Sequence, residues 1–259
     1  MHKPTVETAA LREHILTYAR TRMGYDVPPL DRPQSLEWLT THAGQTITEE
    51  GLGGMRALGV FADVLAPATI STDHPGYLSF IPTAPTEAST LFDLVVSASS
   101  IYGGSWLEGA GAVYAENQVI AWLAAEVGLP ETAGGLFVQG GTLGNLSALV
   151  AARHTARAKR EADGLPMPAR WKFVCSAEAH SSLKAAAAVM DVDIVKAPVD
   201  SEGRLHGSAV EEVLETAGDG VFAVVATSGT TNFGIVDDLD TVGEVAKRHG
   251  YWFHIDGAY

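Results

Sequence analysis

Short apolar runs alternate with single helical segments through the second half of the chain, and this alternation constrains the fold more than any other feature. After Gly134 the runs read LFVQ, WKFVC, DIVKAPV, VFAVVATS and YWFHIDGAY. Strands separated by one helix each form βαβ units, because two parallel strands need a crossover connection between them. We therefore predict an α/β fold in which helices cover both faces of a mainly parallel sheet.

The chain before this region is helical in character and interrupted by prolines. Helical spacing or a capping serine marks ALREHILTYARTRM, SLEWLTTHAGQ and GMRALGVFADVLAPATI. The next stretch, HPGYLSFIPTAP, contains three prolines and cannot be regular throughout. Helical spacing returns between Thr86 and Gly128. We predict a helical segment at residues 1–75 and one larger domain at residues 76–259.

Charge and composition argue against several functional classes. The net charge of −14 repels phosphate backbones, so we expect no nucleic-acid partner. The chain has no apolar stretch of the roughly 18 residues that a membrane helix needs, so we expect no membrane partner. The N-terminus does not resemble a secretory signal. Cys175 is the single cysteine, which excludes an internal disulfide and suits the cytoplasm.

Polar motifs follow the predicted strands, at the edge where an open α/β sheet binds ligands. The first is QGGTLGN, residues 139–145. Gly141 allows close approach of a ligand, Thr142 offers a hydroxyl, and the following helix N-terminus favours an anion. The motif is thus a candidate phosphate cradle. The alternative is a glycine-rich turn with Thr142 as the helix N-cap.

Two further motifs carry hydroxyl and imidazole groups. AHSS places His180 and Ser181 where a strand passes into a helix. SGTTNFG places Thr230 and Thr231 directly after the run VFAVVAT. These side chains can bind a ligand, but a lone histidine is more often structural, and the threonine hydroxyls can serve the turn itself.

The last motif is HIDGAY, residues 254–259. Strand alternation places His254, Asp256 and Ala258 on one face. Burying a carboxylate at the end of an apolar strand costs free energy unless an oppositely charged or hydrogen-bonding group pairs with it. A protonated ring nitrogen of a cofactor is one such partner, and an arginine or a helix N-terminus is the structural alternative.

Taken together, these motifs resemble the group II pyridoxal-dependent decarboxylases, the family of aromatic-amino-acid, histidine and glutamate decarboxylases. The resemblance covers roughly residues 70–259 and is carried most specifically by AHSS, GTTNFGIVDDL and HIDGAY. It implies the large domain of a fold type I PLP-dependent transferase (aspartate aminotransferase-like) at residues 76–259. It also implies pyridoxal 5′-phosphate (PLP) as cofactor and no metal ion.

The resemblance also implies roles for individual residues. His180 would stack on the pyridine ring and assist proton transfer, and Asp256 would pair with the ring nitrogen; these two are the catalytic candidates. The implied cofactor-binding residues are Gly141, Thr142, His180, Ser181, Thr230, Thr231, Asp256 and Ala258. The residues implied to border the substrate are Phe80, Ile81, Pro82 and Thr83.

Some features depart from the family pattern. Leu143 and Gly144 stand where an acidic residue and alanine are common, and Gly257 replaces a common alanine. More seriously, none of the six lysines follows Asp256, whereas the family's Schiff-base lysine comes a few dozen residues after that aspartate. We therefore expect an incomplete large domain, truncated before that lysine and the C-terminal domain.

The resemblance implies decarboxylation of an L-amino acid to the amine and carbon dioxide, with this chain carrying the cofactor-recognition half of the site. We expect the chain alone to be inactive, and to form a homodimer or to take the lysine from a second chain. The alternatives are another fold type I PLP enzyme (an aminotransferase or lyase) or a non-catalytic or split-enzyme subunit. HPGYLSFIPTAP favours an aromatic substrate over glutamate, without excluding aliphatic or diamino acids.

Overall fold

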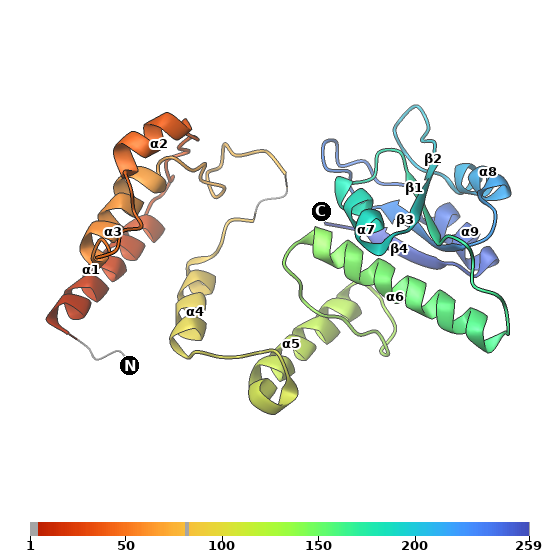
Figure 1. The fold of residues 1–259 in the computed structure, drawn as a ribbon, viewed down its shortest axis with the longest axis horizontal. Coiled ribbons are helices and arrows are strands. Elements are labelled where there is room, and N and C mark those ends of the chain that lie inside the picture. The colour runs from red at the N-terminus through yellow and green to blue at the C-terminus, as the bar shows by residue number, and fades with distance from the viewer. Residues whose placement is uncertain (1–4, 81–82, 259) are drawn as a thin grey trace. The chain divides into compact units, whose positions relative to one another are not determined.

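The computed structural model describes residues 5–80 and 83–258 (Figure 1). The chain divides into two compact units, Met1–Ile101 and Tyr102–Tyr259. The boundary between the two units falls after residue 101, and the predicted division into a helical segment at residues 1–75 and a cofactor-binding domain at residues 76–259 stays a prediction. None of the helices in the described ranges is long and apolar enough to cross a bilayer.

The first unit is helical, as its sequence predicts. Ser35 caps the second of its helices by accepting the N–H of Trp38 at 3.1 Å. The third helix passes directly into a π-helical turn, and Pro67 follows shortly after it. The helices are α1 (Val6–Met23), α2 (Leu36–Ala43), α3 (Gly54–Val60), η1 (Phe61–Leu65) and α4 (Glu87–Ala98).

The second unit contains a four-stranded sheet with the order β2-β1-β3-β4. All of its pairings are parallel, as predicted. Its strands are β1 (Lys172–Ser176), β2 (Asp193–Ala197), β3 (Val221–Thr227) and β4 (Trp252–Asp256). Its helices are α5 (Trp106–Glu126), α6 (Gly141–Ala162), α7 (Ser181–Met190), α8 (Gly207–Ala217) and α9 (Leu239–His249).

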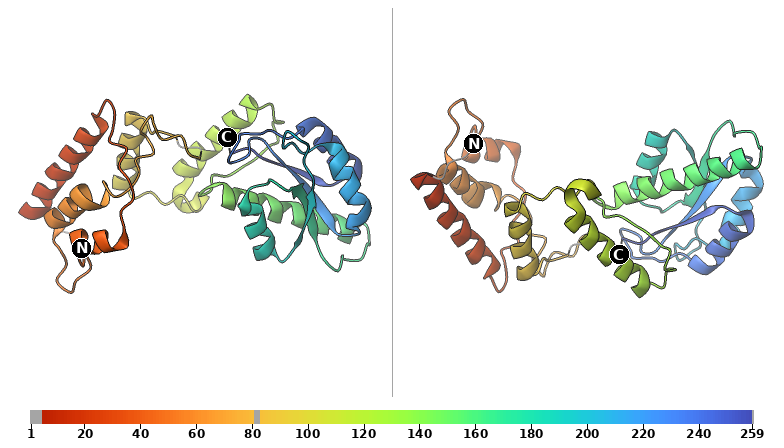
Figure 2. Two further views of the ribbon diagram at one scale, coloured as in Figure 1. Left: turned by 90° about the horizontal axis from the view of Figure 1, so that it is seen from above. Right: turned by 90° about the horizontal axis from the view of Figure 1, so that it is seen from below.

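Helices cover both faces of the sheet (Figure 2). On one face, Leu149 of α6 and Leu183 of α7 pack against Phe173 and Phe222. On the other, Val210 of α8 and Val242 of α9 pack against the alternate strand residues, such as Val224. β3 is buried along its whole length. The near-continuous apolar run VFAVVAT follows from this burial, because both faces of the strand are covered.

The run LFVQ is not a strand, in contrast to the prediction. Residues 136–139 have no regular structure, and Leu136 and Phe137 are exposed. Within the described ranges no strand pairs with this run, so its backbone gains no ladder of hydrogen bonds. An apolar composition alone therefore did not specify a strand here.

Candidate active site

Asp256 ends strand β4, with its side chain toward helix α6. Nδ2 of Asn145 on α6 donates to Oδ2 of Asp256 at 2.9 Å. Oδ1 of the same amide lies 2.7 Å from Nε2 of His254. His254 and Asp256 therefore share one face of the strand, as their alternation predicts.

His180 stands at the start of α7 and caps it. Its Nδ1 accepts the backbone N–H of Ser182 at 3.1 Å and lies 2.8 Å from the Ser182 hydroxyl. That hydroxyl in turn accepts a hydrogen bond from Nδ2 of Asn145 at 2.9 Å. A continuous chain of hydrogen bonds thus connects His180 to Asp256 through Ser182 and Asn145.

The N-terminus of α6 lies one helical turn before Asn145. Gly140, with φ of +83°, precedes the helix, and no side chain caps it. A Cβ at Gly140 or Gly141 would meet nothing within 4 Å, so the approach to the first-turn N–H groups is open. Such N–H groups favour an anion. Thr142 is exposed within the first turn and Gly140 is the N-cap, so the prediction of Thr142 as N-cap is wrong.

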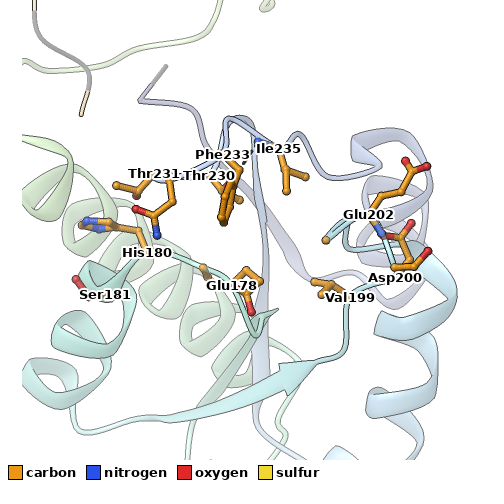
Figure 3. A pocket seen from close by; sticks show the side chains of 14 residues that line it. Glu178, His180, Ser181, Val199, Asp200, Glu202, Thr230, Thr231, Phe233 and Ile235 are labelled. Atoms are coloured by element: carbon orange, nitrogen blue, oxygen red, sulfur yellow. Dashed lines mark hydrogen bonds between the residues drawn. The ribbon is translucent and has the colours of Figure 1, made fainter. Parts of the chain in front are cut away.

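An open pocket of about 660 Å³ lies beside His180 (Figure 3). The loops that follow β1, β2 and β3 form its walls, so it lies at the carboxyl edge of the sheet. Among the sequence-predicted residues, it brings together His180, Ser181, Thr230 and Thr231.

The pocket is acidic at one end. In Figure 3, Asp200 and Glu202 lie at the end opposite His180 and Thr231. The other predicted cofactor residues do not line this pocket. They are Gly141, Thr142, Asp256 and Ala258. Asp256 reaches the pocket only indirectly, through the hydrogen-bonded chain that ends at His180.

The two candidate threonines differ in their surroundings. Thr230 is buried, and its hydroxyl accepts the N–H of Ile235 at 3.1 Å, which closes the loop after β3. Thr231 is half-buried, and its hydroxyl makes no hydrogen bond to the described residues. The Thr230 hydroxyl thus serves the turn, and Thr231 keeps its hydroxyl available to a ligand.

The predicted substrate-bordering residues belong to the first unit or lie outside the described residues. Phe80 is 71% exposed with φ of 60°, and Thr83 is also exposed. Ile81 and Pro82 lie outside the described residues. The roles of all four residues stay predictions.

Sequence reasoning gave no role to Asn145, the residue at the centre of the network. It lies in the quoted motif QGGTLGN, but its only signal was its place one turn after Gly141. It is 4% exposed, and Ser182 is 3% exposed. A buried amide needs partners for its polar atoms, but the burial of Asn145 is evident only in the fold, so the sequence alone did not reveal the network.

Burial sets the charge state of His254. Its partly buried position lowers the pKa of the imidazole, and the charge of Asp256 acts in the opposite direction. A neutral His254 therefore faces Asn145 near neutral pH. Among the described residues, no group of three or more His, Cys, Asp or Glu side chains can hold a metal ion.

Known proteins resemble this chain in sequence and in fold. Residues 54–259 match the family described as "Pyridoxal-dependent decarboxylase conserved domain". The chain belongs to this family. An aromatic-L-amino-acid decarboxylase of Bacillus atrophaeus is 32% identical over 72% of this chain and 39% of the relative. An L-2,4-diaminobutyrate decarboxylase of Acinetobacter baumannii is 28% identical over 82% of this chain and 45% of the relative.

Solved structures agree with the sequence relatives. The glutamate decarboxylase domain of a diaminobutyrate-pyruvate transaminase and L-2,4-diaminobutyrate decarboxylase from Vibrio parahaemolyticus has a TM-score of 0.84 and 26% identity. That match covers 100% of this chain and 59% of the solved chain. The family, the fold class and pyridoxal dependence are confirmed. The chain spans less than half the length of the two sequence relatives named above.

Proposed function

We propose that this chain carries the cofactor-recognition half of the active site of a PLP-dependent L-amino-acid decarboxylase. The observation that carries the proposal is the hydrogen-bonded chain from His180 to Asp256, which gathers the two catalytic candidates at one edge of the sheet. In open α/β sheets this edge is where ligands bind.

The groups present at this edge of the sheet suit PLP. The uncapped start of α6, with open space at Gly141, suits a phosphate. Oδ1 of Asp256 accepts no hydrogen bond from the described residues, which leaves it for a protonated ring nitrogen. The side chain of His180, held at the N-cap of α7, suits a position against a flat ring.

When bound, PLP supplies an electron sink for the charge that develops on the substrate α-carbon after loss of carbon dioxide. This chain's residues would bind and orient that sink. The Asp256 carboxylate would hold a proton on the ring nitrogen by opposite-charge stabilisation. His180 would limit the tilt of the ring, and its Nε2 would be the atom that exchanges a proton with the substrate.

The lysine that holds PLP covalently in this family would come from sequence beyond Tyr259 or from a second chain. We further propose that the assembled protein is a homodimer that acts in the cytoplasm. Exposed apolar side chains on α4, such as Phe92 at 68% exposure, are consistent with association. An aminotransferase or another PLP lyase is the alternative reaction, and a non-catalytic subunit is the alternative class.

Two measurements test the proposal. Equilibrium dialysis of the 259-residue chain against PLP should show saturable, non-covalent binding. A longer protein that includes the lysine should release carbon dioxide from one or more of a panel of L-amino acids, aromatic and diamino acids included. Amino-group transfer to a keto acid without carbon dioxide release would favour the aminotransferase. PLP binding without turnover of any amino acid would favour the non-catalytic subunit.

A further inference from the structure

The amide of Asn145 makes three hydrogen bonds, and both hydrogens of its NH₂ group are used. Nδ2 donates to Oδ2 of Asp256 and to Oγ of Ser182, both at 2.9 Å, and Oδ1 lies 2.7 Å from Nε2 of His254. No buried side-chain nitrogen or oxygen among the described residues lacks a partner. One side chain therefore joins α6, α7 and β4 at a single point.

Hydrogen-bond chemistry fixes the orientation of this amide. An ionised Asp256 can only accept, so the NH₂ group of Asn145 must face it. Oδ1 then faces His254, whose Nε2 must carry the proton that it donates. The rotated amide would set Oδ1 against the Asp256 carboxylate, which has no hydrogen to donate. His254 thus holds the oxygen end of the amide, and the NH₂ end holds one oxygen of Asp256.

The backbone of α7 fixes the tautomer of His180. Its Nδ1 accepts the backbone N–H of Ser182, so in the neutral ring the proton is on Nε2. The Ser182 hydroxyl accepts from Asn145 and therefore turns its own hydrogen toward His180. Each proton in the network has one consistent position, from His254 through Asn145 to His180.

We propose that Asn145 is a positioning residue, which holds Oδ2 of Asp256 so that Oδ1 is presented to the ring nitrogen of PLP. The proposal rests on the proposed function, because it needs PLP in this site. Asn145 itself touches neither cofactor nor substrate. Its effect must therefore depend on the ring nitrogen, whereas a purely structural residue would affect every ligand of the site equally.

Affinity for two compounds tests this dependence. The compounds are PLP and its carbocyclic analogue, in which a C–H group replaces the ring nitrogen, and dialysis measures binding to the 259-residue chain. Asn145→Leu should weaken PLP binding about ten- to a hundredfold, the usual effect of losing a hydrogen bond to a charged group. The analogue should lose about threefold or less. The matched control is Asn117→Leu, at an exposed position on α5, which should change neither affinity.

A second pair of variants keeps the test decisive if Asn145→Leu fails to fold. His254→Gln retains a donor toward Oδ1 of Asn145 and should keep PLP affinity near that of the parent chain. His254→Phe removes the donor, leaves the buried Oδ1 of Asn145 without a partner, and should weaken PLP more than the analogue. Equal losses for both compounds, or no loss in either Asn145→Leu or His254→Phe, would overturn the positioning role.

The proton positions are measured without cofactor. With ¹⁵N-labelled histidine, NMR of the chain should place the proton of His180 and of His254 on Nε2 at neutral pH. In Asn145→Leu, His254 should lose this strict preference. A proton on Nδ1 of either ring in the parent chain would overturn the proposal while leaving the proposed function intact. Binding of neither compound by the parent chain would overturn the proposed function, and the positioning role with it.

Discussion

Asp256 and Asn145 form a 2.9 Å hydrogen bond although 111 residues separate them in the sequence. The bond ties the last strand of the described fold to the second turn of α6. Ser182 of α7 shares the same amide, so three elements must be in place before the network closes. The candidate site is therefore a product of the assembled sheet and its helices, and no local segment can form it alone.

The charge of Asp256 should matter more for turnover than for folding. In an assembled enzyme that includes the lysine, Asp256→Asn should retain PLP but lower kcat about a hundredfold or more, because a neutral amide cannot stabilise the ring proton electrostatically. Steady-state kinetics and the PLP content of the purified variant check this. Asp163→Asn, at the exposed end of α6, is the control. Near-normal kcat in Asp256→Asn would remove the assigned role.

The open space beside Gly141 should be occupied by the phosphate of PLP when the cofactor binds, and by no protein atom. A Cβ there meets no protein atom within 4 Å, so Gly141→Ala should fold normally and stabilise the helix slightly. It should still weaken PLP binding about tenfold, because the methyl group crowds the phosphate and a lost close contact costs on the order of 1 kcal/mol. Dialysis and urea unfolding measure the two effects.

Gly111→Ala is the matched control for Gly141→Ala. Gly111 also lies in a helix with nothing within 4 Å of a built Cβ. Its substitution should change stability in the same direction and leave PLP affinity unaltered. If both variants bind PLP like the parent chain, the start of α6 is not the phosphate site.

His206 should make the stability of the second unit depend on pH. The ring of His206 forms hydrogen bonds with Asp200 and with Asp238. Both bonds raise the pKa of this imidazole above its ordinary value of 6.5, and the bond to Asp200 has the larger effect. When folding raises the pKa of a histidine, the resulting stabilisation is complete at pH values below the pKa of the unfolded chain. It is lost as the pH rises through the pKa of the folded chain. The urea midpoint of the parent chain should therefore fall from pH 6 to pH 8.5 more steeply than that of His206→Gln.

The control for this pH effect is His154→Gln, at an exposed position on α6. Its urea midpoint should follow the parent chain across the whole pH range. An identical pH slope in the parent chain and in His206→Gln would show that the ion pairs of His206 contribute nothing to stability.

The reactivity of the Cys175 thiol should show whether strand β1 is buried or has unfolded. Burial in β1 raises the pKa of its thiol to about 12, and the side chain is 2% exposed. At pH 8 such a thiol has roughly a thousandth of the thiolate of a free cysteine. A thiol reagent should therefore react very slowly with the native chain and rapidly in urea. Fast reaction without urea would contradict the buried position of β1.

The sequence predicted the parallel sheet because each strand combines β-branched residues with a single intervening helix. It also predicted the common face of His254 and Asp256, because a period of two residues is a strict property of strands. These features depend on local geometry. The motifs at the strand ends converge because the carboxyl ends of parallel strands meet at one edge.

Other features depend on contacts that the sequence does not display. The run at residues 136–139 has strand-like composition, but in the described fold no neighbour pairs with it. Asn145 was missed because its partners come from β4 and α7, far along the chain. Helical spacing shows that residue 145 follows residue 141 by one turn. Only the fold shows that the end of β4 lies beside residue 145.

Asp256 and His180 should serve one flat heteroaromatic ring. A crystal structure of the chain with bound PLP would show whether they do. We predict that the ring nitrogen lies within hydrogen-bonding distance of Oδ1 of Asp256, with the ring against His180 and the phosphate at the start of α6. PLP bound elsewhere, or a ring nitrogen turned away from the Asp256 carboxylate, would contradict this account.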